Sequence, residues 1–291
     1  MRREKQSAIN FVKGFVIGSS DIVPGVSGGT MALILGVYEK LIGEISNISR
    51  RGANLFRGGS LKSLVRSVDW RFLVPLLIGV GSAIIVLSRP LDYALQTEPM
   101  FIWAFFFGLV AGSVYFVGRR VRSMRHSMWF VGILGFVLAY LVVGIIPIET
   151  AATPLLFMFS GAIGIAATML PGVSGSFLLL IIGKYGQIIT AIHTWDVRTL
   201  AFFGVGVCLG LFLFSRLIGW LLEHYHDWAI IFLVGLMTGS LRKIWPWKLG
   251  EANVFPVAID RSVVLVLILA IIGYMTVFYL EKLSRVASYK K

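Results

Sequence analysis

The chain has 291 residues, of which 57% are hydrophobic and 14% are charged, and its formal net charge is +13. Soluble domains hold roughly 45 to 50% apolar residues, so this composition excludes a soluble globule and predicts an integral membrane protein. The basic residues gather between or beside the apolar runs, which is typical of cytoplasmic loops and argues against a nucleic-acid surface. Cys208 is the single cysteine, which excludes an intrachain disulfide and a multi-cysteine metal site.

The first apolar segment, about 9–45, is interrupted at 20–30 by the stretch SDIVPGVSGGT. Pro24 and Gly25 break a helix there, and the freed backbone groups need partners other than lipid. Basic residues flank the segment on both sides, so we expect a re-entrant hairpin that enters from the cytoplasm and returns to it. Two roles are open for Asp21 beside the tip: carrying a coupling proton, or a structural role as a cap or an ion-pair partner.

Three long apolar runs follow, near 71–88, 101–118 and 128–147. Each approaches the roughly 20 residues that span a hydrocarbon core as a helix. Arg89 comes directly after the first run. It is predicted either to bind a phosphate through its guanidinium or to extend from a helix end to the interface, and the same two interpretations apply to Arg216.

The second half repeats the first. The sequence PGVSGGTMALILGVYEKLIGEI at 24–45 aligns without gaps to PGVSGSFLLLIIGKYGQIITAI at 171–192, an offset of 147, and the similarity continues at an offset of 127. Pro171 and Gly172 are therefore the second break, in a hairpin at about 155–192. We predict two copies of one unit, residues 1–147 and 148–291, forming one membrane domain.

Each copy contributes a hairpin and about three transmembrane helices, an odd number of crossings that inverts the second copy and leaves both termini in the cytoplasm. The predicted fold is an all-α integral membrane protein with two inverted-topology repeats. One feature fits this topology poorly. The loop at 242–261 carries Arg242, Lys243, Lys248 and Arg261, yet it falls outside.

The breaks have two interpretations. Ser27 and Ser174 are expected to cap the second helix of each hairpin, with glycines that allow tight packing. Alternatively, the free N–H groups and positive dipole ends of these half-helices form anion sites near the midplane, which is favoured by their recurrence in inverted halves. The predicted phosphate-binding residues are Ser27, Gly28, Gly29, Thr30, Ser174, Gly175, Ser176, Arg89 and Arg216.

Lys184 is placed with Asp21 as a candidate coupling or gating residue. It lies ten residues after Ser174, roughly 15 Å along a helix, so an interfacial position with its amine extended to water is the favoured expectation.

An enzymatic interpretation is also open, because residues 25–29 satisfy the pattern G-x-S-x-G and the Gly-x-Ser-Gly loops resemble the nucleophile loop of rhomboid proteases. Such a serine needs a base. The four histidines, His126, His193, His224 and His226, all fall in predicted loops or at helix ends.

The paired PGVSGG and PGVSGS segments, the longer stretch SDIVPGVSGGTMALILGVYEKLI and the spacing of the later runs resemble the bacterial polyprenyl-phosphate (undecaprenyl phosphate) translocases. The resemblance covers essentially the whole chain. It implies a flippase, not an enzyme, that returns undecaprenyl phosphate from the outer to the inner leaflet of the bacterial cytoplasmic membrane for peptidoglycan and surface glycan synthesis. The hairpin tips would hold the head group, and Arg89 and Arg216 would admit it from opposite faces.

The membrane undecaprenyl-diphosphatases are the nearest enzymatic rival, with a signature resembling Pro-Gly-x-Ser-Arg. Here Gly28 and Gly175 stand where that arginine would be, and no Glu-x-x-x-Glu pair is present. A scaffold that only recruits enzymes explains neither the duplication nor the breaks. The expected partners are the polyprenyl phosphate lipid and membrane lipids, with a homo-oligomer left open, and no cofactor, metal or nucleic acid is expected.

Overall fold

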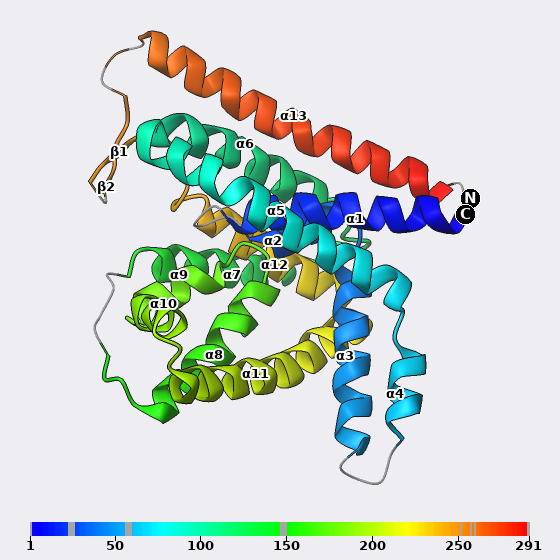
Figure 1. Cartoon of the computed structure of the whole chain (residues 1–291). Coiled ribbons are helices and arrows are strands. Elements are labelled where there is room, and N and C mark those ends of the chain that lie inside the picture. Colours follow the sequence, from blue (N-terminus) through cyan, green and yellow to red (C-terminus); the bar gives the residue numbers. More distant parts are fainter. Residues whose placement is uncertain are drawn as a thin grey trace.

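The computed structural model describes residues 2–22, 27–55, 60–145, 150–250, 252–256, 258 and 260–289 (Figure 1). Within these ranges the first half forms α1 (Arg2–Asp21), α2 (Gly28–Ile34), α3 (Tyr38–Leu55), α4 (Leu61–Ser67), α5 (Trp70–Thr97), α6 (Pro99–Gly118) and α7 (Met128–Val143). The second half forms α8 (Pro154–Met169), α9 (Gly175–Ile181), α10 (Tyr185–His193), α11 (Val197–His224), α12 (His226–Ser240), β1 (Lys248–Leu249), β2 (Ala252–Asn253) and α13 (Arg261–Tyr289). The predicted all-α fold is confirmed.

Both expected interruptions are present as short broken helices. In the first hairpin, Ser27 caps α2 with extended backbone angles, and α2 ends in a turn at Gly36 before α3. In the second, Ser174 caps α9 in the same conformation, and a turn at Gly183 leads into α10 with a bend of 106°. Gly36 and Gly183 share a φ of +67°, which glycine adopts without the steric penalty of a side chain.

The long helices begin at equivalent residues of the two halves. Asp69 caps α5 by accepting from the N–H of Phe72, and Asp196 caps α11 by accepting from the N–H of Thr199. Among the described residues, four helices are long and apolar enough to cross a membrane, and a fifth span results if the bent pair is counted as one. The four are α5, α6, α11 and α13.

Two differences from the expected elements stand out. The third run of the first half, expected over 128–147, forms the shorter helix α7, and residues 146–149 lie outside the described ranges. The basic loop between the hairpin and α5 contains the additional helix α4, which the sequence analysis did not predict.

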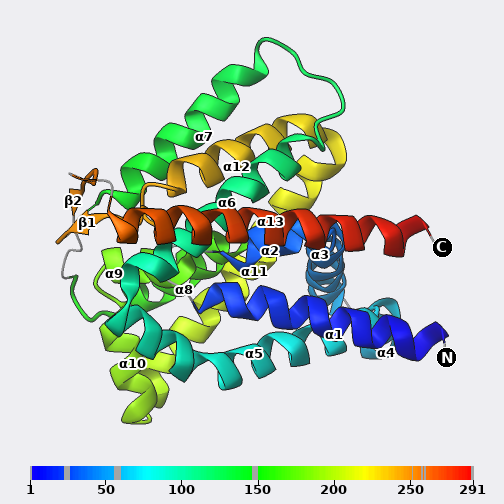
Figure 2. The same cartoon turned by 90° about the horizontal axis from the view of Figure 1, so that it is seen from above.

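Glycine allows the main helix pairs to approach closely. α1 packs on α5 and α8 on α11, whereas α6 packs on α13 and α7 on α12, so that the two halves interlock (Figures 1 and 2). At Gly108 of α6 a Cβ would collide with the carbonyl oxygen of Ala270 in α13, and at Gly235 of α12 one would collide with the carbonyl oxygen of Gly132 in α7. These contacts need glycine because backbone meets backbone.

The half-helix α2 lies at the centre of the core. Residues 30–34 are at most 1% exposed, and residues from both halves surround them. A helix start at this depth is tolerated because protein, not lipid, surrounds α2. The two termini lie together at one end of the molecule, and the β1–β2 loop lies at the opposite end (Figures 1 and 2).

Candidate functional site

The two hairpin tips meet at the centre of the molecule. Thr30 Oγ1 accepts a hydrogen bond from the backbone N–H of Gly172 at 3.0 Å, and Ser27 Oγ donates to the carbonyl oxygen of Leu170 at 3.3 Å. Tyr38, at the start of α3, donates its hydroxyl to the carbonyl oxygen of the neighbouring Met169 at 2.8 Å. The first tip therefore binds the backbone of the second break, next to Pro171. Pro24 and Gly25 of the first break lie outside the described residues.

The first tip does not have the free amides that the sequence predicted. The N–H of Gly28 donates to Asp21 Oδ1 at 2.6 Å, the N–H of Gly29 to Ser27 Oγ at 3.2 Å, and the N–H of Thr30 to the carbonyl oxygen of Ser27 at 2.9 Å. These amides have acceptors within the protein because α1 ends with its carboxylate beside the start of α2 and Ser27 caps that helix. Asp21 occupies the place that an anion would take.

The second tip differs because it has no acid. Thr168 stands at the position equivalent to Asp21, and its hydroxyl donates back to the carbonyl oxygen of Gly164 at 2.9 Å. Ser174 accepts from the N–H of Phe177 at 3.4 Å, and its hydroxyl lies 3.0 Å from that of Ser176. Within the described ranges, the N–H groups of Gly175 and Ser176 have no hydrogen-bond partner, which is the normal state of the first amides of a helix.

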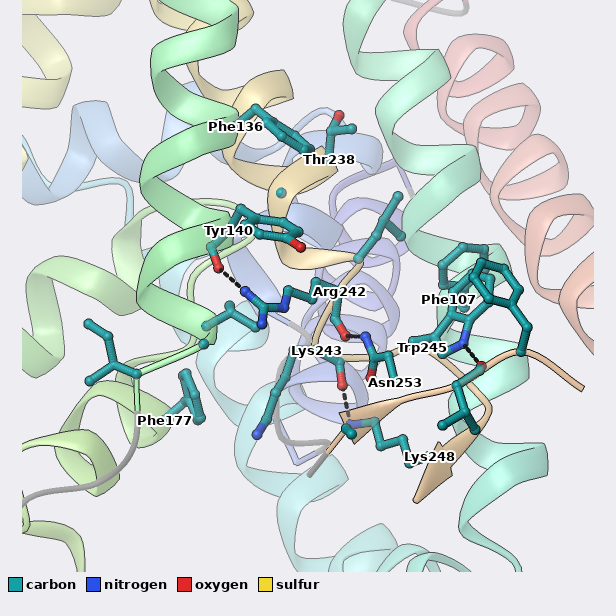
Figure 3. A pocket seen from close by; sticks show the side chains of 18 of the residues that line it. Phe107, Phe136, Tyr140, Phe177, Thr238, Arg242, Lys243, Trp245, Lys248 and Asn253 are labelled. Atoms are coloured by element: carbon teal, nitrogen blue, oxygen red, sulfur yellow. Dashed lines mark hydrogen bonds between the residues drawn. The ribbon is translucent and has the colours of Figure 1, made fainter. Parts of the chain in front are cut away.

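A cationic pocket of about 750 Å³ adjoins this second tip (Figure 3). Its cations are Arg242 and Lys243, which follow α12, and Lys248 of β1. Its walls are largely apolar and come from α6, α7, α9 and the β1–β2 loop. The labelled wall residues include Phe107, Phe136, Tyr140, Phe177 and Trp245.

Aromatic rings and carbonyl groups hold the cations in place. Arg242 donates to the carbonyl oxygen of Tyr140 at 3.1 Å and lies 4.2 Å from the centre of its ring. Lys243 Nζ lies 4.5 Å from the ring centre of Phe177, and Lys248 donates to the carbonyl oxygen of Lys243 at 2.6 Å. Among the described residues that line the pocket there are three cations and no carboxylate, a composition that favours an anion.

Three residues connect the pocket to the hairpin tip. Val143, Phe177 and Lys243 line both the cationic pocket and a small adjoining cavity of about 10 Å³ that also touches Gly172 and Ser174. The structure thus brings a cation cluster against the second tip, a relationship that the sequence analysis missed. The sequence did contain a signal for it: the basic residues of the loop at 242–261 fitted the predicted topology poorly, and Trp245 and Trp247 lie between them.

The two predicted arginines lie away from both tips. Arg89 is exposed on α5. Arg216 is half-buried on α11, where it donates to the carbonyl oxygen of Ser49 in α3 at 3.3 Å and stacks at 4.1 Å on the ring of Phe212. In the described part of the chain, neither arginine has a hydrogen bond to a tip residue.

Lys184 is buried, with 1% of its surface exposed, so its amine does not extend to water as expected. Its amine donates to the carbonyl oxygens of Thr150 and Ala151 at 3.1 and 2.5 Å, and to Gln187 Oε1 at 2.9 Å. These acceptors replace water around the charge. Lys184 therefore ties the break after α9 to the segment before α8.

The serines of the two tips lack the geometry of a nucleophile. Over the described residues, the hydrogen-bond partners of Ser27 and Ser174 are backbone groups and the hydroxyl of Ser176, and no histidine is among them. His226 instead bonds the carboxylates of Asp227 and Glu39 near the start of α12. Among the described residues, no base is placed to activate either serine.

The apolar spans and the broken helices define a multi-pass membrane protein, in which a cationic pocket adjoins the second helix break. Residues 17–260 match the family described as undecaprenyl phosphate translocase-like. A polyprenyl-phosphate transporter of Vibrio cholerae is 39% identical over 82% of this chain and 77% of its own length. A polyprenyl-phosphate transporter of Staphylococcus aureus is 31% identical over 82% of this chain and 86% of its own length. No solved structure matches.

This chain belongs to the undecaprenyl phosphate translocase-like family. The family resemblance carried by the two glycine-rich segments is confirmed.

Proposed function

We propose that this chain transports polyprenyl phosphate, specifically undecaprenyl phosphate, from the outer to the inner leaflet of the bacterial cytoplasmic membrane without cleaving it. The names of both relatives support the substrate class. The observation that carries the proposal is the joining of Arg242 and Lys243 to the second hairpin tip through a pocket with apolar walls. A lipid with one phosphate head and an isoprenoid tail matches this combination.

The proposed topology concerns which side of the membrane each end of the molecule faces. With both termini in the cytoplasm, the cationic pocket opens toward the outside, because it lies beside the β1–β2 loop at the opposite end (Figure 2). In this topology the basic loop after α12 lies outside and departs from the positive-inside rule, and the proposed function gives a reason for this departure. Its cations attract the head group of a lipid in the outer leaflet.

The proposed path starts at Arg242, Lys243 and Lys248 and continues to the hydroxyl and amide groups of 174–176. The hydroxyls of Ser27 and Thr30 come next, at the first tip. There the head group must displace the Asp21 carboxylate from the N–H group of Gly28, because a carboxylate and a phosphate compete for the same donor.

The tail does not need to enter the protein. Many large apolar side chains of the outer helices are exposed and present a lipid-like surface, so the isoprenoid chain stays in the bilayer while the head crosses. We propose that the two halves, 1–147 and 148–291, are inverted repeats whose rocking changes which side is open. The equivalent helix starts and the interlocked pairs support this arrangement.

The experiment is transbilayer movement of labelled undecaprenyl phosphate in liposomes that contain the purified full-length chain, with released inorganic phosphate measured in the same sample. We expect movement faster than in protein-free vesicles and no phosphate release. The double variant Arg242→Gln with Lys243→Gln should slow movement about tenfold or more, since a hydrogen bond to a charged group contributes roughly 1.5–3 kcal/mol.

Arg261→Gln is the matched control, because Arg261 is exposed at the start of α13 near the same end but does not line the pocket. Thermal melting of each variant in detergent checks the fold. Unchanged movement in a folded double variant would reject the pocket as the entry site. Cleavage of undecaprenyl diphosphate together with absent movement would favour the phosphatase instead.

A further inference from the structure

A second basic cavity lies where α3 crosses the C-terminal part of α11, on the side of the molecule toward the two termini (Figure 1). Its volume is about 560 Å³, and it is lined by Arg50, Arg216, Trp220, Glu223 and His224. The two cations come from different halves of the chain. The cavity shares no lining residue with the cationic pocket beside the β1–β2 loop.

Arg216 has unused hydrogen-bonding capacity. One Nη donates to the carbonyl oxygen of Ser49 at 3.3 Å, the long end of the range for such a bond, while its Nε is buried with no partner among the described groups. Buried polar groups are nearly always paired, so the unpaired Nε of Arg216, whose side chain lines the cavity, indicates a place where another group binds.

Arg50 is available to a ligand for a different reason. Its Nη2 lies 3.7 Å from Glu223 Oε1, and the two side chains are 56% and 61% exposed. An ion pair with this separation and exposure is weak, because water screens it. An anion with more charge than a carboxylate can therefore displace Glu223 from Arg50.

The wall of the cavity is aromatic. Trp220 stacks on His224 with ring centres 5.4 Å apart, and Trp220 is 47% exposed. Tryptophan at a membrane surface presents an apolar ring beside a polar edge. The cavity thus offers two guanidinium groups for a phosphate and an indole ring for the first apolar carbons of a chain.

We propose that this cavity is a second phosphate-binding site, which holds a phosphomonoester head group at the end of the molecule opposite the cationic pocket. It rests on the proposed function for its lipid ligand, and it gives the head group a place to stop before it leaves the protein. Arg216 turns from Ser49 toward the phosphate, and Arg50 exchanges Glu223 for it. Planar guanidinium groups suit this role because each can form two parallel bonds to phosphate oxygens.

The test measures which arginines a ligand covers. Full-length protein in detergent is treated with phenylglyoxal, which modifies arginine side chains, and modification is quantified at each arginine by mass spectrometry. The additions compared are none, farnesyl phosphate, and inorganic phosphate. We expect farnesyl phosphate to slow modification of Arg50 and Arg216 about tenfold, while Arg51 reacts at an unchanged rate. Arg51 is the internal control because it bonds Asn47 Oδ1 and lines a different cavity.

A lipid head group and free phosphate are distinguished by the concentration of each compound that protects the arginines. Protection by farnesyl phosphate at lower concentration than inorganic phosphate supports the lipid site, and equal protection by both assigns the cavity to free phosphate and overturns the lipid part. Absence of protection at Arg50 and Arg216 overturns the site. Protection at Arg242 is measured in the same spectra, so failure of this inference is separated from failure of the proposed entry pocket.

Variants give an independent check. Arg216→Lys keeps the charge but removes the planar fork, so it should weaken protection of Arg50 by farnesyl phosphate about tenfold. Glu223→Gln removes the competing carboxylate and should strengthen that protection, an effect that a folding defect does not produce. Weaker protection of Arg50 in Glu223→Gln would contradict the proposal.

Discussion

Thr30 and Gly172 are 142 residues apart, yet the threonine hydroxyl oxygen accepts the backbone N–H of the glycine at 3.0 Å. Both groups are buried at the centre of the molecule. The bond joins the first half-helix to the second helix break, so the two tips are a single structural unit. A change at one tip is therefore expected to reach the other.

Thr30→Val removes the acceptor while keeping the shape of the side chain. The N–H of Gly172 is left buried and unpaired, which should lower the free energy of unfolding by about 1–3 kcal/mol. Thermal unfolding in detergent measures this change. Thr276→Val is the control, because the Thr276 hydroxyl bonds only the carbonyl oxygen of Ile272 in its own helix. Equal melting temperatures for the two variants would contradict a role for the contact between the tips.

Gly172→Ala should destabilise the protein more strongly. Gly172 has a φ of +84°, and a Cβ there would lie 2.7 Å from Met237 Cα in α12. The left-handed conformation costs roughly 1–2 kcal/mol for a residue with a side chain, and the contact with backbone adds to that cost. Gly186→Ala, which meets no atom within 4 Å, should leave the yield and melting temperature of the purified protein nearly unchanged. Comparable losses at both positions would rule out this explanation.

Lys184→Met tests the buried amine. The change leaves the carbonyl oxygen of Ala151 without its donor and that of Thr150 with Gln187 alone, so we expect a loss of about 2 kcal/mol in unfolding free energy and slower lipid transport. Lys62→Met, on the exposed surface of α4, is the matched control. If Lys184 were an interfacial lysine, the two substitutions would have similarly small effects.

The pair Lys40 and Asp69 predicts a pH dependence at the start of α5. The amine of Lys40 donates to Asp69 Oδ2 at 2.6 Å, and this hydrogen bond holds the pKa of Asp69 below its ordinary value. A lowered pKa in the folded state adds stability above the unfolded pKa, near 3.9, and that stability is lost as pH falls through the lower folded pKa. Because the pair is exposed, the contribution is at most about 1 kcal/mol.

Asp69→Asn isolates this contribution, since asparagine still caps the helix. The difference in melting temperature between the native protein and Asp69→Asn should be present at pH 6 and shrink below about pH 4. A difference that stays constant down to pH 3 would mean that the cap, and not the charge, is responsible. Lys40→Met should remove the same pH dependence.

The proposed topology can be tested by labelling in intact cells. In a Cys208→Ser background, Leu249→Cys lies on the β1–β2 loop, where the native side chain is 75% exposed, and should react with a membrane-impermeant maleimide added outside. Ser63→Cys on α4 should react only after the cells are opened. The opposite pattern would place the cationic pocket at the cytoplasmic side.

The helix breaks were predictable because their causes are local. Adjacent proline and glycine disfavour a continuous helix, and Ser27 and Ser174 cap the helices that follow. The matching turns at Gly36 and Gly183 lie at the offset that the sequence alignment used. Neighbouring residues determine these features, so the sequence was sufficient to find them.

The state of the tip amides was not predictable from the same residues. Whether the N–H of Gly28 is free depends on where the carboxylate of Asp21 lies, and that depends on how α1 packs on α5. Lys184 shows the same limit. Its spacing from Ser174 suggested the interface, but the carbonyl oxygens of Thr150 and Ala151, more than 30 residues away, provide enough acceptors for burial.

The sequence by itself determined a helical membrane protein with two matching broken segments, because apolar length, proline and glycine act through solvent and local backbone geometry. Only the tertiary structure decided which polar groups share a site. Arg242, Tyr140 and Phe177 belong to three separate segments, and they meet in one pocket because the helices of the two halves interlock. Contacts between distant segments depend on packing, which no local pattern specifies.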